Sequence, residues 1–199
     1  MATHLSLEVK RIMRRELKDM GESILRKQCL ELGLDWKELV AGDLDRLSPQ
    51  ISKAITTFTG REKADKIVRE IEKFKVLEEL AMVDGVAGQV ARKKRLDALR
   101  RLGGICHLMG EWENALGYLS ESHALAREIP GHGKLFSIVA SIASVKLEMG
   151  HFEDARTMLE GALDEALKDR EADSVAGINR VLGKLLWRTG EFDSSIKAS

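Results

Sequence analysis

The sequence predicts an all-α protein with two parts, a small N-terminal helical bundle and a solenoid of paired helices. The helix-favouring residues Ala, Leu, Glu, Lys and Arg dominate its 199 residues, which include two prolines and no strand-forming run of β-branched and aromatic residues. The second half also repeats itself. The sequence around Gly110 returns around Gly150 and Gly190, each time after 40 residues, and a fixed period of this length is typical of a helical solenoid.

Residues 1–83 lack this repeat and are expected to form the bundle as a separate domain. Apolar residues at helical spacing predict one helix from about Leu5 to Gly33, where glycine is a stop signal. A short helical turn is expected over Asp35–Leu39. The apolar face of the first helix consists of Leu5, Val9, Ile12, Met13, Leu17, Met20, Ile24 and Leu25.

Two further helices complete the predicted bundle. Ser48 and Pro49 suit the start of a helix, with serine as the N-cap and proline at the first helical position. This helix is expected to bury Phe58 and to end at Gly60. The last helix is predicted over Arg61–Met82, and packing the apolar faces of all four helices together would give the bundle its core.

The boundary between the two parts is predicted over residues 84–88, where Gly85 and Gly88 interrupt the helical pattern. A helix is expected to restart near Gln89 and to enter the first repeat.

Each repeat has small and large residues at fixed distances from its glycine. Seven and eight residues before the glycines stand Leu102-Gly103, Ile142-Ala143 and Leu182-Gly183. Two residues after them stand Trp112, Phe152 and Phe192, and five residues after them Ala115, Ala155 and Ser195. This pattern resembles the tetratricopeptide repeat, and its length is similar to the 40-residue variety found in kinesin light chain and polarity adaptors.

The resemblance covers about residues 90–199 and implies a superhelical solenoid. The repeats are expected over residues 89–130, 131–170 and 171–199. The last one stops before its second helix is complete, so we expect a fragment of a longer array, although a partner or a second copy could instead cover this end.

The resemblance also implies where a partner would bind. In tetratricopeptide proteins the first helix of each repeat lines a concave groove, and the positions that correspond to it here are Arg100, His107, Ser144, Arg180, Lys184 and Trp187. The basic residues would hold an acidic peptide or a C-terminal carboxylate, and Trp187 would provide an apolar anchor. Exposed basic residues are common, so ordinary solvated charges stay open as the alternative. Trp112 is expected in the core.

The sequence gives no sign of catalysis or of a metal or cofactor site. The histidines lack metal-ligand spacing, Cys29 and Cys106 are isolated, and no nucleophile–base pair can be assigned, so we expect no catalytic residue, metal or cofactor. The net charge of zero gives no indication of nucleic acid or an anionic membrane as partner, and no apolar run approaches a membrane span. A cytoplasmic location is expected.

The function predicted is therefore a non-catalytic protein–protein interaction module, an adaptor or assembly scaffold that binds a peptide or helix in the groove. The alternative is a regulatory module whose N-terminal bundle binds a ligand or self-associates. An enzymatic role would require an apolar pocket with convergent polar groups, which the sequence does not indicate.

Overall fold

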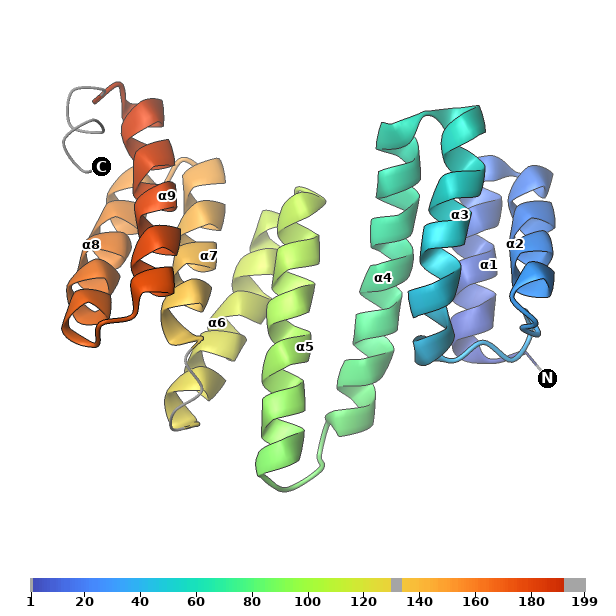
Figure 1. Cartoon of the computed structure of the whole chain (residues 1–199), viewed down its shortest axis with the longest axis horizontal. Helices are drawn as coiled ribbons and strands as arrows, with labels where there is room; N and C mark the ends of the chain where they lie inside the picture. Colours follow the sequence, from blue (N-terminus) through green and yellow to red (C-terminus); the bar gives the residue numbers. More distant parts are fainter. Residues whose placement is uncertain (1, 130–133, 192–199) are drawn as a thin grey trace. The chain divides into compact units, whose positions relative to one another are not determined.

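The computed structural model of the protein describes residues 2–129 and 134–191. All regular structure in these residues is helical, which confirms the predicted all-α class (Figure 1). The chain divides into two compact units, residues 1–85 and 86–199, which are called the N-terminal and C-terminal units below. No helix in the described ranges is long and apolar enough to cross a membrane.

The N-terminal unit contains four α-helices and one 3₁₀ turn. They are α1 (His4–Leu17), α2 (Asp19–Glu31), η1 (Ala41–Asp43), α3 (Leu44–Thr59) and α4 (Arg61–Val83). Helix α1 packs against α2 and α4, and α3 packs against α2 and α4. Their apolar faces meet in one core that includes Val9, Ile12, Met13, Leu25, Leu47, Ile51, Ile67 and Ile71.

The single helix expected from Leu5 to Gly33 is two helices, so this prediction was wrong. The chain reverses at Lys18, whose φ of 56° is unusual for a residue with a β-carbon. Gly21 allows α2 to return along α1, because a β-carbon at this position would lie 2.2 Å from the carbonyl oxygen of Met13. Neither proline nor glycine stands at the turn itself, and the apolar spacing continues through it.

The region between α2 and α3 also differs from the prediction. Residues 36–38 form a turn rather than a short helix, and helical structure begins with η1. The carboxylate of Asp43 accepts a hydrogen bond from the backbone N–H of Val40 at 3.0 Å, which stabilises this start.

Helix α3 begins before the predicted start, and Pro49 lies inside it. Ser48 is not the N-cap, because it lies inside α3, and its buried hydroxyl has no hydrogen-bond partner among the described residues. Phe58 is 68% exposed rather than part of the core. The predicted end at Gly60 and the predicted span of the last helix agree with the structure.

In its described residues, 86–129 and 134–191, the C-terminal unit contains two helical hairpins and a fifth helix. Helices α5 (Gln89–Leu108) and α6 (Trp112–Glu128) form the first hairpin, and α7 (Leu135–Glu148) and α8 (Phe152–Lys168) form the second. Helix α9 (Ala172–Thr189) packs against α7 and α8 (Figure 1). The predicted positions Phe192 and Ser195 lie outside the described residues.

The repeating glycines have one structural role, which is to end the first helix of each repeat. Gly110, Gly150 and Gly190 all have φ between 76° and 83°. At each of them the following N–H donates to a carbonyl five residues earlier at 2.9 Å, from Glu111 to Cys106 in the first repeat. This is the Schellman arrangement, which satisfies carbonyls that a helix end leaves free.

Small residues next to these ends bring the helices of a hairpin together, as expected. A β-carbon on Gly103 would lie 2.5 Å from Cγ of Leu119, so α5 and α6 can adopt this spacing only with glycine. Ala115 and Ala155 are fully buried. Trp112, expected in the core, is 37% exposed, because it lies at the start of α6.

Candidate binding pocket of the C-terminal unit

The first helices of the three repeats, α5, α7 and α9, lie next to one another with α7 in the middle. Together they line a pocket of about 340 Å³, a size within the range of about 300–1,000 Å³ typical of ligand sites. Its lining consists of Arg100, His107, Ser137, Ala140, Ser141, Ser144, Gly177, Arg180, Val181 and Lys184.

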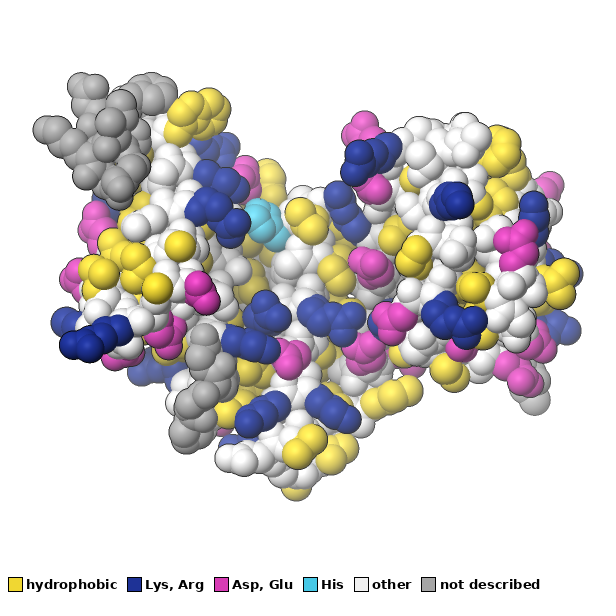
Figure 2. Space-filling model, viewed as in Figure 1, with side chains coloured by type: hydrophobic (Ala, Val, Ile, Leu, Met, Phe, Trp, Pro, Cys, Tyr) yellow, Lys and Arg dark blue, Asp and Glu magenta, His cyan; other side chains and the backbone are white. Residues whose placement is uncertain are grey.

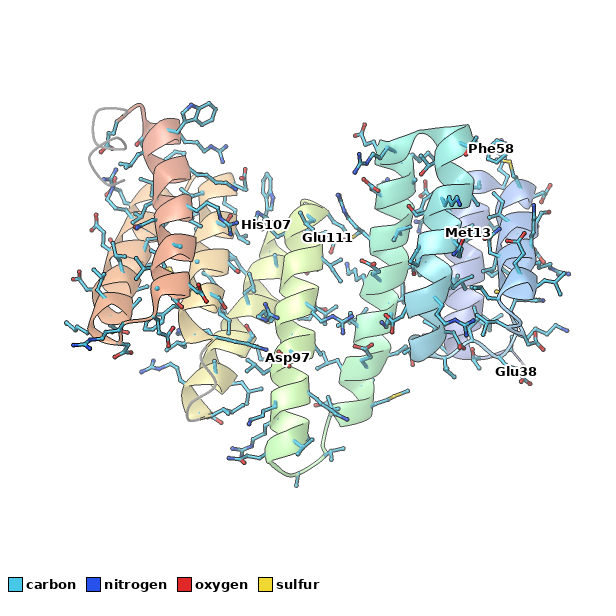
Figure 3. All side chains as sticks on the ribbon, viewed as in Figure 1. Met13, Glu38, Phe58, Asp97, His107 and Glu111 are labelled. Carbon is cyan, nitrogen blue, oxygen red and sulfur yellow. The ribbon has the colours of Figure 1, made fainter. Side chains whose placement is uncertain are left out.

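Helical spacing explains why these side chains share one surface. Arg100 and His107 are seven residues apart on α5, and Arg180 and Lys184 are four apart on α9, so each pair faces the same side of its helix. His107 lies on the side of α5 that faces α7 and α9 (Figure 3).

Five of the six residues predicted from the sequence line this pocket. The sixth, Trp187, does not, and its side chain is 67% exposed near the end of α9. Sequence reasoning missed Ser137 and Ser141, although both lie on the face of Ser144 at helical spacing. The spacing of the serines on α7 was the signal that could have identified them.

The pocket is positively charged. Arg100, Arg180 and Lys184 contribute three cations, and the described residues place no acidic side chain in the pocket lining. None of the three forms an ion pair with a described residue, whereas five other basic residues of α5 to α9 do: Arg92, Arg95, Lys146, Arg156 and Arg188. Figure 2 shows Lys and Arg side chains gathered over α5 and over the neighbouring edge of α9.

Arg100 has an unsatisfied hydrogen-bond donor. Its Nε is buried and has no partner among the described residues. A buried donor without an acceptor costs about 1–3 kcal/mol, so an acceptor entering the pocket would recover part of this free energy.

Hydroxyl groups lie along α7 between the cations. The hydroxyl of Ser137 donates to the carbonyl of Lys134 at 2.8 Å, and that of Ser141 donates to the carbonyl of Ser137 at 2.9 Å. Ser144 makes no hydrogen bond with a described residue through its side chain, so its hydroxyl can donate to a ligand.

His107 adds a titratable group to the pocket. Burial lowers the pKa of its imidazole, Glu148 raises it, and Lys184 lowers it. The net direction is downward, so His107 is neutral near pH 7 and does not add a fourth charge.

One ion pair holds two of the pocket's helices together outside the pocket. Nη1 of Arg188 on α9 lies 2.8 Å from Oε2 of Glu148 and donates to the carbonyl of Leu147 at 3.1 Å. Because Glu148 pairs with Arg188, it does not pair with Arg100, Arg180 or Lys184 in the pocket.

The family of this segment follows from a comparison with known proteins. Residues 94–168 match the model of the tetratricopeptide repeat family. This segment is similar to tetratricopeptide repeats. The match covers α5 from residue 94 through all of α8, and it does not extend to the N-terminal unit. The kinesin light chain variety stays a prediction. A search of curated proteins gives no significant match.

The similarity to tetratricopeptide repeats agrees with the close approach at Gly103 and with the glycine at the ends of α5, α7 and α9. Proteins built from such repeats generally mediate protein–protein interactions, and the first-helix surface is where a partner is expected. No group of three or more His, Cys, Asp or Glu side chains that could hold a metal ion occurs in residues 2–129 or 134–191.

Proposed function

We propose that the C-terminal unit is a non-catalytic binding module that holds an acidic segment of a partner protein in the pocket of α5, α7 and α9. The observation that carries this proposal is that Arg100, Arg180 and Lys184 meet at one pocket, where no acidic side chain of the described part of the chain pairs with them. Charged hydrogen bonds from arginine to carboxylates are among the stronger polar contacts, which makes acidic side chains the best fit.

The role of such a module is that of an adaptor or assembly scaffold in the cytoplasm. Docking would use groups from three successive repeats at once, so affinity depends on how these helices are stacked. Trp187 lies one turn beyond Lys184 on α9 and would contact an apolar residue of a segment that extends past the pocket.

A peptide titration tests the proposal. We expect a fluorescein-labelled hexaglutamate to bind the full-length protein, whereas hexalysine does not. Fluorescence anisotropy at low and high salt measures this, and affinity for hexaglutamate should fall as salt rises.

A charge-reversal pair provides the control. The double variant Arg180→Glu/Lys184→Glu should lose binding of hexaglutamate. The matched variant Lys93→Glu/Lys94→Glu makes the same change of net charge on exposed residues of α5 that do not line the pocket, and it should retain most of the affinity. Equal loss in both variants would mean that only overall charge matters and that the pocket is not the site.

A second candidate function belongs to the N-terminal unit. Helices α2 and α3 line a cavity of about 540 Å³, and its lining includes the exposed side chains of Met20 and Phe58. Figure 3 labels Phe58 on α3. Lys27, Lys53 and Glu31 also line the cavity, and Nζ of Lys27 lies 3.8 Å from Oε1 of Glu31. Because Met20 and Phe58 leave apolar surface exposed beside these charges, we propose self-association through this groove as the second candidate.

Sedimentation of the full-length protein tests self-association. Wild type should form a dimer at high concentration, and Phe58→Glu should be monomeric. The matched change Leu30→Glu replaces another exposed apolar residue of the same unit outside the groove, and it should leave the dimer intact.

A further inference from the structure

We infer that the pocket of α5, α7 and α9 selects a phosphorylated side chain of its partner over a carboxylate. This inference rests on the proposed function, and it specifies the chemical group that the same pocket recognises.

Charge is the first reason. The residues that the structure describes give the pocket three cations and no acidic side chain. A carboxylate neutralises one of these charges, whereas a phosphorylated serine carries a charge of about −1.5 to −2 near pH 7. The gain in electrostatic free energy is therefore larger for the phosphoryl group.

The direction of the donors is the second reason. Arg100 extends from α5, Arg180 and Lys184 extend from α9, and Ser144 lies on the helix between them. A carboxylate accepts hydrogen bonds in one plane. A phosphoryl group has three terminal oxygens in a tetrahedral arrangement, and it can accept from several helices at once.

The unused donors are the third reason. The Nε of Arg100 is buried without a partner, and the Ser144 hydroxyl makes no hydrogen bond with a described residue. Neither Arg180 nor Lys184 has an ion-pair partner within the described ranges. A ligand with few acceptor atoms would leave several of these donors unsatisfied.

A set of short peptides with one variable residue tests the inference. The probes are the blocked pentapeptides Gly-Gly-Xaa-Gly-Gly, in which Xaa is phosphoserine, glutamate or serine, together with inorganic phosphate. Binding to the full-length, ¹⁵N-labelled protein is followed by NMR at constant ionic strength. We expect the phosphoserine peptide to bind roughly tenfold more tightly than the glutamate peptide, and the serine peptide not to bind.

Single variants locate the site. Arg180→Gln and Lys184→Gln change exposed side chains and should each reduce affinity for the phosphoserine peptide roughly tenfold. Lys93→Gln, with the same charge change outside the pocket, should have little effect. Circular dichroism confirms that each variant is folded.

The outcomes separate this inference from the proposed function. Equal affinities for the phosphoserine and glutamate peptides would overturn the inference and leave the acidic-segment function in place. No binding of any peptide would overturn both. Inorganic phosphate that binds as tightly as the phosphoserine peptide would show that the pocket recognises the free anion, which also overturns the inference.

Discussion

Gly103 on α5 lies so close to Leu119 on α6 that a β-carbon would come within 2.5 Å of the Leu119 Cγ. The next residue, Gly104, is also helical but has no atom within 4 Å of such a β-carbon. Of these two adjacent glycines on one helix, Gly103 is therefore tightly packed against α6, whereas Gly104 has open space beside it.

The first prediction uses this pair. Gly103→Ala should lower the free energy of unfolding by about 1–3 kcal/mol, because the new methyl group forces α5 and α6 apart. Gly104→Ala should raise it by up to about 1 kcal/mol, because alanine favours the helix. Urea titration in a Trp36→Phe background measures this, since the two remaining tryptophans, Trp112 and Trp187, lie in the C-terminal unit. Equal changes in the free energy of unfolding for the two substitutions would contradict the close contact between Gly103 and Leu119.

The second prediction concerns Arg170, which ends α8 with a φ of 57°. The N–H of Glu171 donates to the carbonyl of Ala166 at 3.0 Å, as at the repeating glycines. The left-handed conformation costs a residue with a β-carbon about 1–2 kcal/mol, so Arg170→Gly should stabilise the C-terminal unit by about 0.5–1 kcal/mol. Arg170→Ala retains the β-carbon and should give no such gain in the same urea titration.

The third prediction concerns Lys75, a buried cation in the core of the N-terminal unit. Its Nζ pairs with Asp45 and lies 3.6 Å from Glu79, while the Lys75 side chain is only 8% exposed. Asp45→Asn should reduce stability by about 1 kcal/mol, because a mostly buried charge loses a partner while Glu79 remains.

Lys75→Met is the matched change at the same contact. It removes the charge and retains most of the side-chain volume, so this variant should be at least as stable as wild type. Trp36 fluorescence in a Trp112→Phe/Trp187→Phe background follows the N-terminal unit alone. A methionine variant much less stable than Asp45→Asn would show that the ion pair itself stabilises the fold.

The fourth prediction is a pH dependence of stability. Burial lowers the pKa of both His107 and His123 below the ordinary value of 6.5, and Arg127 adds to this effect at His123. Around His107, Glu148 opposes the shift, and Arg100, Arg180 and Lys184 share its pocket.

The sign follows from proton binding. Between the lowered pKa values and 6.5, the unfolded chain binds more protons than the folded one, so stability rises with pH through this window and falls on acidification. Urea midpoints from about pH 5 to 8 should show this trend, and His107→Gln together with His123→Gln should flatten it. An unchanged slope in the double variant would assign the trend to other groups.

The sequence predicted the C-terminal unit better than the N-terminal one, and the reason is physical. The glycines at 110, 150 and 190 require a backbone conformation that few other residues adopt, so their spacing fixed both the helix ends and which side chains share a face. The five predicted residues that line the pocket follow from that spacing together with the groove positions that the tetratricopeptide resemblance implies.

The turn at Lys18 and the start of α3 had no comparable signal. The reversal at Lys18 uses an ordinary residue in a strained conformation, and the spacing of Leu17 and Met20 is compatible with one continuous helix. Pro49 looks like a helix start, but the helix begins one turn earlier because η1 leads into it. The exposed position of Phe58 depends on how α2 and α3 pack, which local sequence does not determine.

The pocket is lined by three helices of successive repeats and is not enclosed within one helical hairpin. Helix α7 packs against both α5 and α9, so the pocket exists only while this packing is in place. A ligand that touches both outer helices binds the folded array and not the unfolded chain, and it therefore stabilises the stacking of the repeats in proportion to its occupancy.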